Sequence, residues 1–163
     1  EYSNAFGMKV VYNDINKNKL PNYISSKRNS LDELLNKSDV IFLSASYEEN
    51  MGKFILGKEQ IKKIKKGSIF INISRGELVD NESLLISLRK GFLKAIGLDV
   101  LPMDSEWNVN THDYLKDNEF YKSLIKDPNV YLTPHVGGYA KDAINLTRQF
   151  ILEKAMKFVG IYS

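Results

Sequence analysis

The sequence predicts an α/β fold built on a doubly wound parallel sheet. Short apolar runs typical of buried strands alternate along the chain with segments whose apolar residues have helical spacing. The strand runs are almost continuously apolar, which is expected of parallel strands covered on both faces. Residues that favour helix starts and stops stand between the two kinds of segment. This alternation is typical of one parallel sheet with helices packed against it.

The first 45 residues predict two strands with one helix between them. Residues 8–12 form a short apolar run, and a polar stretch without regular spacing follows it. Ser30 and Glu33 have the spacing of a capping box, in which each side chain binds the other residue's backbone N–H group. We therefore expect a helix over residues 31–35. Residues 40–45 are predicted to form the second strand.

The central part of the chain predicts two helices and two strands in alternation. Residues 58–64 have helical spacing, and residues 68–73 form the third apolar strand run. Residues 81–90 predict a helix that buries its leucines and stops at Gly91, because glycine readily ends a helix. Residues 94–100 are predicted to form the fourth strand.

The last third of the chain predicts a fifth strand over residues 130–132 and a long amphipathic helix over residues 141–159. Residues 101–128 are expected to form a polar loop. This loop holds Trp107, Tyr114, Phe120 and Tyr121. Its tryptophan and its tyrosines are expected to pack or to form an interface rather than to contact substrate.

Composition excludes several classes of function. The chain carries 23 basic and 20 acidic residues spread along its length, for a net charge of +3. Since no basic cluster is interleaved with aromatic residues, we expect no nucleic-acid partner. No apolar stretch reaches membrane-spanning length, so we expect no membrane partner. The absence of cysteine excludes disulfides and thiolate metal sites and fits a cytoplasmic protein, and we expect no bound metal.

Two reactive side chains follow predicted strands. Arg75 comes just after the third strand, and His135 just after the fifth. In parallel sheets, ligands bind beyond the carboxyl ends of the strands. A guanidinium there can hold a carboxylate through two parallel hydrogen bonds, and an imidazole can exchange a proton near neutral pH. Taken alone, Arg75 would more often be a surface residue near a turn, and His135 a loop residue or a structural cap.

Several segments carry a family resemblance. They are NISRGELVD at residues 72–80, GLDV at 97–100 and LTPHVGG at 132–138. In sequence, order and spacing they resemble the signature segments of the D-isomer-specific 2-hydroxyacid dehydrogenases, as do FGMKV at 6–10 and SLDELL at 30–35. The resemblance covers almost the whole chain. It implies a Rossmann-like sheet that binds NAD, and a homodimer.

The resemblance implies hydride transfer between NAD(H) and a small 2-oxo or 2-hydroxy acid of the D series. Arg75 would bind the carboxylate and the carbonyl oxygen of the substrate, and His135 would be the acid–base. The family places a glutamate, which supports the histidine, where this chain has Asp104, one methylene shorter. Glu106 is the alternative partner. Glyoxylate, hydroxypyruvate and phosphoglycerate-type substrates are all compatible with these residues.

The resemblance also implies a set of cofactor-binding positions near the predicted strand ends. Asp14 would accept hydrogen bonds from the adenosine ribose and, by repelling a 2′-phosphate, would favour NAD over NADP. Asp99 would bind the nicotinamide carboxamide. In isolation, Asp14 could be a turn residue and Asp99 a strand-end cap. The full set is Asp14, Ala45, Ile73, Ser74, Asp99, Gly137 and Gly138, the two glycines being expected to serve backbone geometry and close approach.

One part of the family pattern does not occur in this sequence. No G-x-G-x-x-G is present, and the match begins just downstream of where the family carries it. We expect residues 1–140 to be a dinucleotide-binding domain without its first strand and glycine loop. That strand is expected in the middle of the sheet, between residues 8–12 and residues 68–73. Residues 141–163 are expected to form a helix that returns toward a substrate domain, as part of a longer polypeptide.

Two other interpretations stay open. Related proteins act as NAD-sensing transcriptional corepressors with the same fold and keep the arginine and the histidine, so Arg75 and His135 do not distinguish the two functions. A hydrophobic peptide groove in the upstream domain would distinguish a corepressor from a dehydrogenase. The third interpretation is an inactive truncated fragment.

Overall fold

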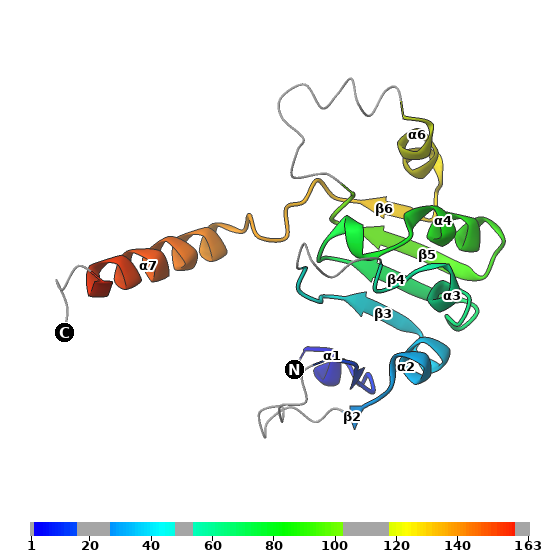
Figure 1. The fold of residues 1–163 in the computed structure, drawn as a ribbon, viewed down its shortest axis with the longest axis horizontal. Helices are drawn as coiled ribbons and strands as arrows, with labels where there is room; N and C mark the ends of the chain where they lie inside the picture. Colours follow the sequence, from blue (N-terminus) through cyan, green and yellow to red (C-terminus); the bar gives the residue numbers. More distant parts are fainter. Residues whose placement is uncertain (1, 16–26, 48–53, 103–117, 159–163) are drawn as a thin grey trace.

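The main sheet of the molecule is parallel throughout. The computed structural model describes residues 2–15, 27–47, 54–102 and 118–158. Its four-stranded sheet has the order β3 (Val40–Leu43), β4 (Ser68–Asn72), β5 (Leu93–Leu98) and β6 (Val130–Leu132), as Figure 1 shows. The α/β class and the parallel sheet predicted from the sequence are confirmed.

A second, two-stranded sheet forms from β1 (Val11–Tyr12) and β2 (Lys27–Arg28), which are also parallel. The expected position of the missing strand, between residues 8–12 and residues 68–73, is wrong. Strand β4 is paired on both of its edges, with β3 on one side and β5 on the other. Among the described residues, β3 is the edge strand of the main sheet on the side of β4 away from β5. Its other edge pairs with no described strand.

The helices alternate with these strands. Their bounds are α1 Tyr2–Ala5, α2 Leu31–Lys37, α3 Lys58–Ile61, a short 3-10 helix Gly76–Leu78, α4 Asn81–Arg89, α6 Glu119–Lys126 and α7 Lys141–Phe158.

Helix α2 begins as the sequence predicts. The Ser30 hydroxyl accepts from the Glu33 N–H, and the Glu33 carboxylate accepts from the Ser30 N–H, so the capping box is confirmed. Gly91 ends α4 with φ +71°, a left-handed conformation that glycine adopts without steric cost. Helix α3 is shorter than predicted, because residues 63 and 64 continue as a turn whose N–H groups bind carbonyls three residues back.

Helix α6 lies inside the segment that we expected to be an irregular loop, and that expectation is wrong. The Asn118 side chain caps it by accepting from the N–H groups of Phe120 and Tyr121. Tyr121 and Leu124 are buried in the core, with Phe120 packed against it. The apolar face of this helix is short and is interrupted by polar residues, so the sequence gives a weak helical pattern. The helix is stabilised by packing against the end of the sheet.

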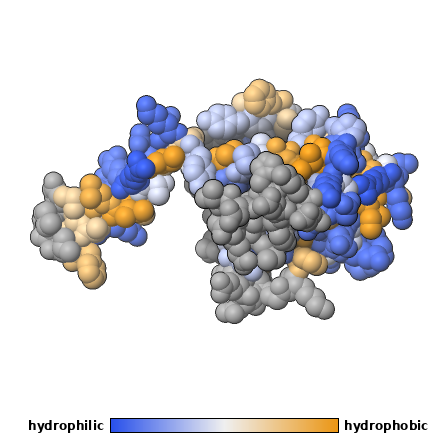
Figure 2. All heavy atoms as spheres, turned by 90° about the horizontal axis from the view of Figure 1, so that it is seen from above, coloured by the Kyte–Doolittle hydropathy of each residue, from blue (hydrophilic) through white to orange (hydrophobic). Residues whose placement is uncertain are grey.

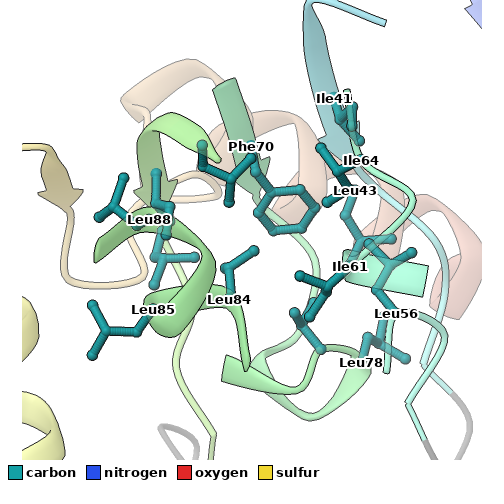
Figure 3. Close-up of a cluster of buried hydrophobic side chains, with 14 of the residues drawn as sticks. Ile41, Leu43, Leu56, Ile61, Ile64, Phe70, Leu78, Leu84, Leu85 and Leu88 are labelled. Carbon is teal, nitrogen blue, oxygen red and sulfur yellow. The ribbon is translucent and has the colours of Figure 1, made fainter. Parts of the chain in front are cut away.

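The hydrophobic core lies between one face of the main sheet and the helices α2, α3 and α4. Strands contribute alternate residues, such as Ile41 and Phe70, and α4 contributes Leu84, Leu85 and Leu88. Figure 3 shows Phe70 within this cluster. Since burial of apolar surface supplies most of the stabilisation of a domain, this cluster holds the strand ends in place.

Helix α7 has a different environment. None of its residues is buried, and it extends away from the sheet (Figure 1). Hydrophobic side chains lie on its surface in Figure 2, and the exposed large ones are Leu146, Phe150, Ile151, Leu152 and Phe158. In the part of the chain that the structure describes, no helix is long and apolar enough to cross a membrane.

Candidate active site

The carboxyl ends of the four main-sheet strands are aligned with one another. In the register of the sheet, Leu43 lies beside Asn72, Asn72 beside Leu98, and Leu98 beside Leu132. Backbone bonds continue this alignment past the strands, from Asp99 N–H to Asn72 O and from Thr133 N–H to Leu98 O, each at 3.0 Å. The segments that follow the strands therefore leave the sheet at one edge, where parallel sheets bind ligands.

The turn after β4 presents Arg75. Asn72 is fully buried, and its side chain accepts from the Ser74 N–H at 3.0 Å and donates to the Arg75 carbonyl at 2.9 Å. The Ser74 hydroxyl donates to the Ala45 carbonyl, so two predicted cofactor residues are in direct contact. The Arg75 side chain is exposed, and its Nη1 donates to the Ser74 carbonyl at 2.8 Å.

Gly76 is the most tightly packed position of this turn. A Cβ at Gly76 would lie 2.1 Å from the backbone carbon of Leu101 and from the nitrogen of Pro102, so only glycine fits there. The Asn81 side chain, from the first turn of α4, donates to the carbonyls of Gly76 and Val79, both at 2.8 Å. The backbone beside Arg75 is thus fixed from several directions.

The loop after β6 is bound to the end of β5 through Asp99. Its carboxylate accepts from the Thr133 hydroxyl, from the Val136 N–H at 3.0 Å and from the Gly137 N–H at 2.9 Å. His135, between these donors, is half-buried and has φ +53°, a left-handed conformation uncommon for residues other than glycine. The three bonds hold the backbone on both sides of this histidine.

These bonds also change the acidity of Asp99. Partial burial raises the pKa of its carboxyl group and is the largest single effect. The hydrogen bonds accepted from the loop, together with the nearby imidazole of His135, outweigh burial and hold the pKa below its usual value. Asp99 is therefore an ionised residue at neutral pH, with one lone pair, on Oδ2, left for a further donor.

The two predicted glycines differ. A Cβ at Gly137 would lie 2.9 Å from Asp99 Oδ2, so a neighbouring side chain approaches this glycine closely. At Gly138, no atom of the described residues lies within 4 Å of a Cβ, and φ is not positive.

The remaining predicted residues are placed less closely together. Ile73 follows β4 directly and is half exposed at the shared edge. Asp14 follows β1 in the two-stranded sheet, and its carbonyl accepts from Arg28 Nη2 at 2.7 Å. Asp104 and its alternative Glu106 lie outside the described residues. Within the described ranges, no group of three His, Cys, Asp or Glu side chains could hold a metal ion.

Sequence reasoning missed three residues that organise this edge, Asn72, Asn81 and Thr133. It also missed Arg28, which donates to the Asp14 carbonyl in the two-stranded sheet. A buried asparagine at the end of an apolar strand is an available signal, since such a side chain needs hydrogen-bond partners. In the sequence, Asn81 looks like an ordinary residue at the start of a helix. Its contacts with the preceding turn have no signature in the sequence.

Comparison with known proteins identifies the family. Residues 1–137 match the family model described as D-isomer specific 2-hydroxyacid dehydrogenase, NAD binding domain. The chain belongs to this family. A D-2-hydroxyacid dehydrogenase relative, the putative D-lactate dehydrogenase of Dictyostelium discoideum, is 33% identical over 144 residues, which are 86% of this chain and 42% of that protein.

Solved structures of D-2-hydroxyacid dehydrogenases have the same fold. D-2-hydroxyisocaproate dehydrogenase superposes with a TM-score of 0.86 at 28% identity, over 96% of this chain and 47% of that one. D-lactate dehydrogenase from Aquifex aeolicus, complexed with NAD and lactic acid, superposes with a TM-score of 0.79 at 30% identity, over 97% and 48%. The chain thus spans less than half the length of these relatives.

Proposed function

We propose that the polypeptide carrying this chain is an NAD-dependent dehydrogenase that interconverts small 2-oxo acids and D-2-hydroxy acids. The observation that supports it best is the alignment of the strand ends, from which Arg75, Asp99 and His135 emerge at one edge of the sheet. The relatives are named for lactate, hydroxyisocaproate, aromatic 2-oxo acids and phosphoglycerate, so they support a 2-oxo or 2-hydroxy acid and leave its size and charge open.

The residues at the sheet edge fit the binding of a nicotinamide ring. Ile73 offers exposed apolar surface beside the nicotinamide position, and Asp99 retains acceptor capacity for a carboxamide N–H. Bound NADH supplies the hydride. The described residues contain no glycine-rich turn at a helix N-terminus, so the group that would hold the pyrophosphate lies outside them.

The proposed reaction uses Arg75 and His135 in separate roles. The planar guanidinium of Arg75 holds the substrate carboxylate through two hydrogen bonds, so that the carbonyl carbon is fixed in position. The imidazole of His135 gives its proton to the carbonyl oxygen as this oxygen becomes an alkoxide, and takes it back in the reverse direction. Charge on Arg75 also stabilises the developing alkoxide.

The test is a screen of 2-oxo acids with NADH, followed by substitution of the histidine. We expect His135→Ala to abolish reduction and to leave the dissociation constant of NADH nearly unchanged, because the imidazole acts on the substrate. His112→Ala is the matched control, since His112 is the other histidine of the sequence and should be dispensable. Undiminished turnover of His135→Ala would overturn the proposed function.

The acidic partner of His135 is proposed to be Asp104, with Glu106 as the alternative. A carboxylate beside an imidazole interacts with its charge, so removing the true partner should displace the pH–rate profile. Asp104→Ala and Glu106→Ala are compared, and the variant with the displaced profile identifies the partner. If neither profile moves, neither residue supports the histidine.

The domain assignment and assembly are proposals as well. We propose that residues 1–140 belong to a dinucleotide-binding domain, that residues 141–163 lead toward a substrate domain, and that the protein is a cytoplasmic homodimer. The apolar side chains of α7, none of which is buried, support packing of this helix on another protein surface. Light scattering of the purified polypeptide tests the dimer, and a monomer mass would contradict it.

A further inference from the structure

Two buried asparagines hold the turn that carries Arg75. Asn72 ends β4 with no exposed surface, in a strand that is otherwise apolar except for Ser68. Both ends of its amide bind the turn, as acceptor from the Ser74 N–H and as donor to the Arg75 carbonyl. Because a buried amide is costly unless it is hydrogen-bonded, these two contacts account for its place in the strand.

Asn81, at the start of α4, binds the same turn further along the chain. It is 7% exposed, and its single Nδ2 group donates to the carbonyls of Gly76 and Val79. The helix does not need Asn81 as a cap, because the Asp80 carboxylate already accepts from the Ser83 N–H at 3.0 Å. The bonds of Asn81 are all made backward, to the turn.

The acceptor end of Asn81 strengthens this interpretation. Its Oδ1 is buried and has no hydrogen-bond partner among the described residues. Leaving a buried acceptor unpaired is unfavourable, so a role limited to helix stability would favour a residue without the amide. The amide is instead explained by the two carbonyls that it binds.

The exposed guanidinium of Arg75 donates to the Ser74 carbonyl at 2.8 Å, so its direction depends on the backbone of the turn at residues 74 and 75. We propose that Asn72 and Asn81 are positioning residues, which fix the carbonyls of Arg75 and Gly76 and thereby aim the guanidinium at the substrate carboxylate. This inference rests on the proposed function of Arg75. It adds two residues that act through the arginine, without contact with the substrate.

The first test compares substrate and cofactor binding in the polypeptide that carries this chain. We expect Asn81→Ala to raise the KM of the 2-oxo acid by about ten- to a hundred-fold, as misplacement of a clamp does, while the dissociation constant of NADH stays within about two-fold. Ser83→Ala is the matched control. It removes a 2.7 Å bond to Asp80 at the same helix start without contact with the turn, and should leave KM unchanged.

A second variant keeps the test available where Asn81→Ala does not fold. Asn72→Asp has the shape of the native residue and keeps the acceptor for the Ser74 N–H, but its ionised form loses the donor to the Arg75 carbonyl. We expect the same rise in KM and an unchanged dissociation constant of NADH.

A double-mutant cycle with Arg75→Ala tests separately whether Arg75 binds the substrate carboxylate and whether Asn81 acts through Arg75. If Asn81 acts through Arg75, its substitution raises KM in the native background and has no further effect in the Arg75→Ala background. An equal rise in KM in both backgrounds overturns the inference. It is also overturned if both asparagine variants have the same KM as Ser83→Ala. If Arg75→Ala itself leaves KM unchanged, the proposed clamp fails, and the positioning role fails with it.

Discussion

Asp99 and Gly137 are in such close contact that the side chain of one restricts the identity of the other. Asp99 Oδ2 accepts from the Gly137 N–H at 2.9 Å, and the same oxygen would lie 2.9 Å from a Cβ at Gly137. The contact joins the end of β5 to the loop after β6, and this loop carries His135. Glycine at residue 137 is therefore required by a neighbouring carboxylate and not by a positive φ.

We predict that Gly137→Ala destabilises the protein by about 1–3 kcal/mol, the usual cost of overpacking, because the new methyl group displaces the Asp99 carboxylate. Chemical denaturation measures the free energy of unfolding. Gly138→Ala is the control, since a Cβ there meets nothing within 4 Å, and it should change stability by less than about 0.5 kcal/mol. Equal effects of the two substitutions would contradict the close-contact explanation.

Stability should depend on pH through Asp99. Its pKa is lowered in the folded state below the ordinary value of 3.8, so the unfolded chain binds its proton first as the pH falls. The stabilisation is therefore complete above the unfolded-state pKa and is lost as the pH falls through the folded-state pKa. We predict that the stability difference between the native protein and Asp99→Asn is constant near neutral pH and shrinks below pH 3.8.

Urea denaturation of the native protein and of Asp99→Asn at a series of pH values measures this difference. A difference that grows as the pH falls would show that the folded-state pKa is raised, not lowered. Thr133→Val provides an intermediate case, because it removes one of the three donors and leaves the two backbone N–H groups in place.

The elements that could be predicted from the sequence are those with a local signal. The capping box of Ser30 and Glu33 and the stop at Gly91 depend on neighbouring residues, and both are confirmed. Helix α6 was missed because its apolar face is short and becomes helical through packing. Strand β2 was missed because Lys27 and Arg28 have no apolar pattern and pair only through their backbone.

Burial in the sheet shows a second limit of sequence reasoning. Nearly continuous apolar strands predicted cover on both faces, but Phe70 has no exposed surface whereas Phe42 is 58% exposed. In the described residues, the face that carries Phe42 and its registered neighbour Ile71 is less covered than the opposite face. Hydrophobicity shows which residues favour burial, and it does not show which layer covers them.

For the site, the position after a strand drew attention to Arg75 and His135, and the family resemblance was needed to select them together with Asp99. Their supports could not be predicted, because Asn72, Asn81 and Thr133 act through contacts that join separate elements. The sequence also gave no reason to distinguish Gly137 from Gly138, since the distinction depends on a carboxylate 38 positions away from Gly137.

The backbone contact at Gly76 should make this position intolerant of any side chain. We predict that Gly76→Ala destabilises the protein by about 3 kcal/mol or more, because its Cβ would meet the backbone of Leu101 and Pro102 at 2.1 Å and neither can move as a side chain does. Gly97→Ala is the control, because a Cβ at Gly97 makes ordinary contact with Ile71 at 3.5 Å. Thermal unfolding of both variants measures the contrast, and a Gly76→Ala variant as stable as Gly97→Ala would contradict the packing at this turn.

The last prediction concerns the choice between NAD and NADP at Asp14. The Arg28 guanidinium donates to the Asp14 backbone carbonyl at 2.7 Å, so a cation lies against the backbone of Asp14 just after β1. If Asp14 faces the adenosine ribose, its charge repels a 2′-phosphate, whereas the arginine would attract one. We predict that Asp14→Asn lowers the ratio of the KM for NADPH to the KM for NADH about ten-fold, equivalent to roughly 1.4 kcal/mol.

Adding Arg28→Ala to Asp14→Asn should restore much of the original ratio, because the attracting cation is then gone. Steady-state kinetics with both cofactors measures the ratio, and a ratio unchanged by Asp14→Asn would show that this carboxylate does not select the cofactor.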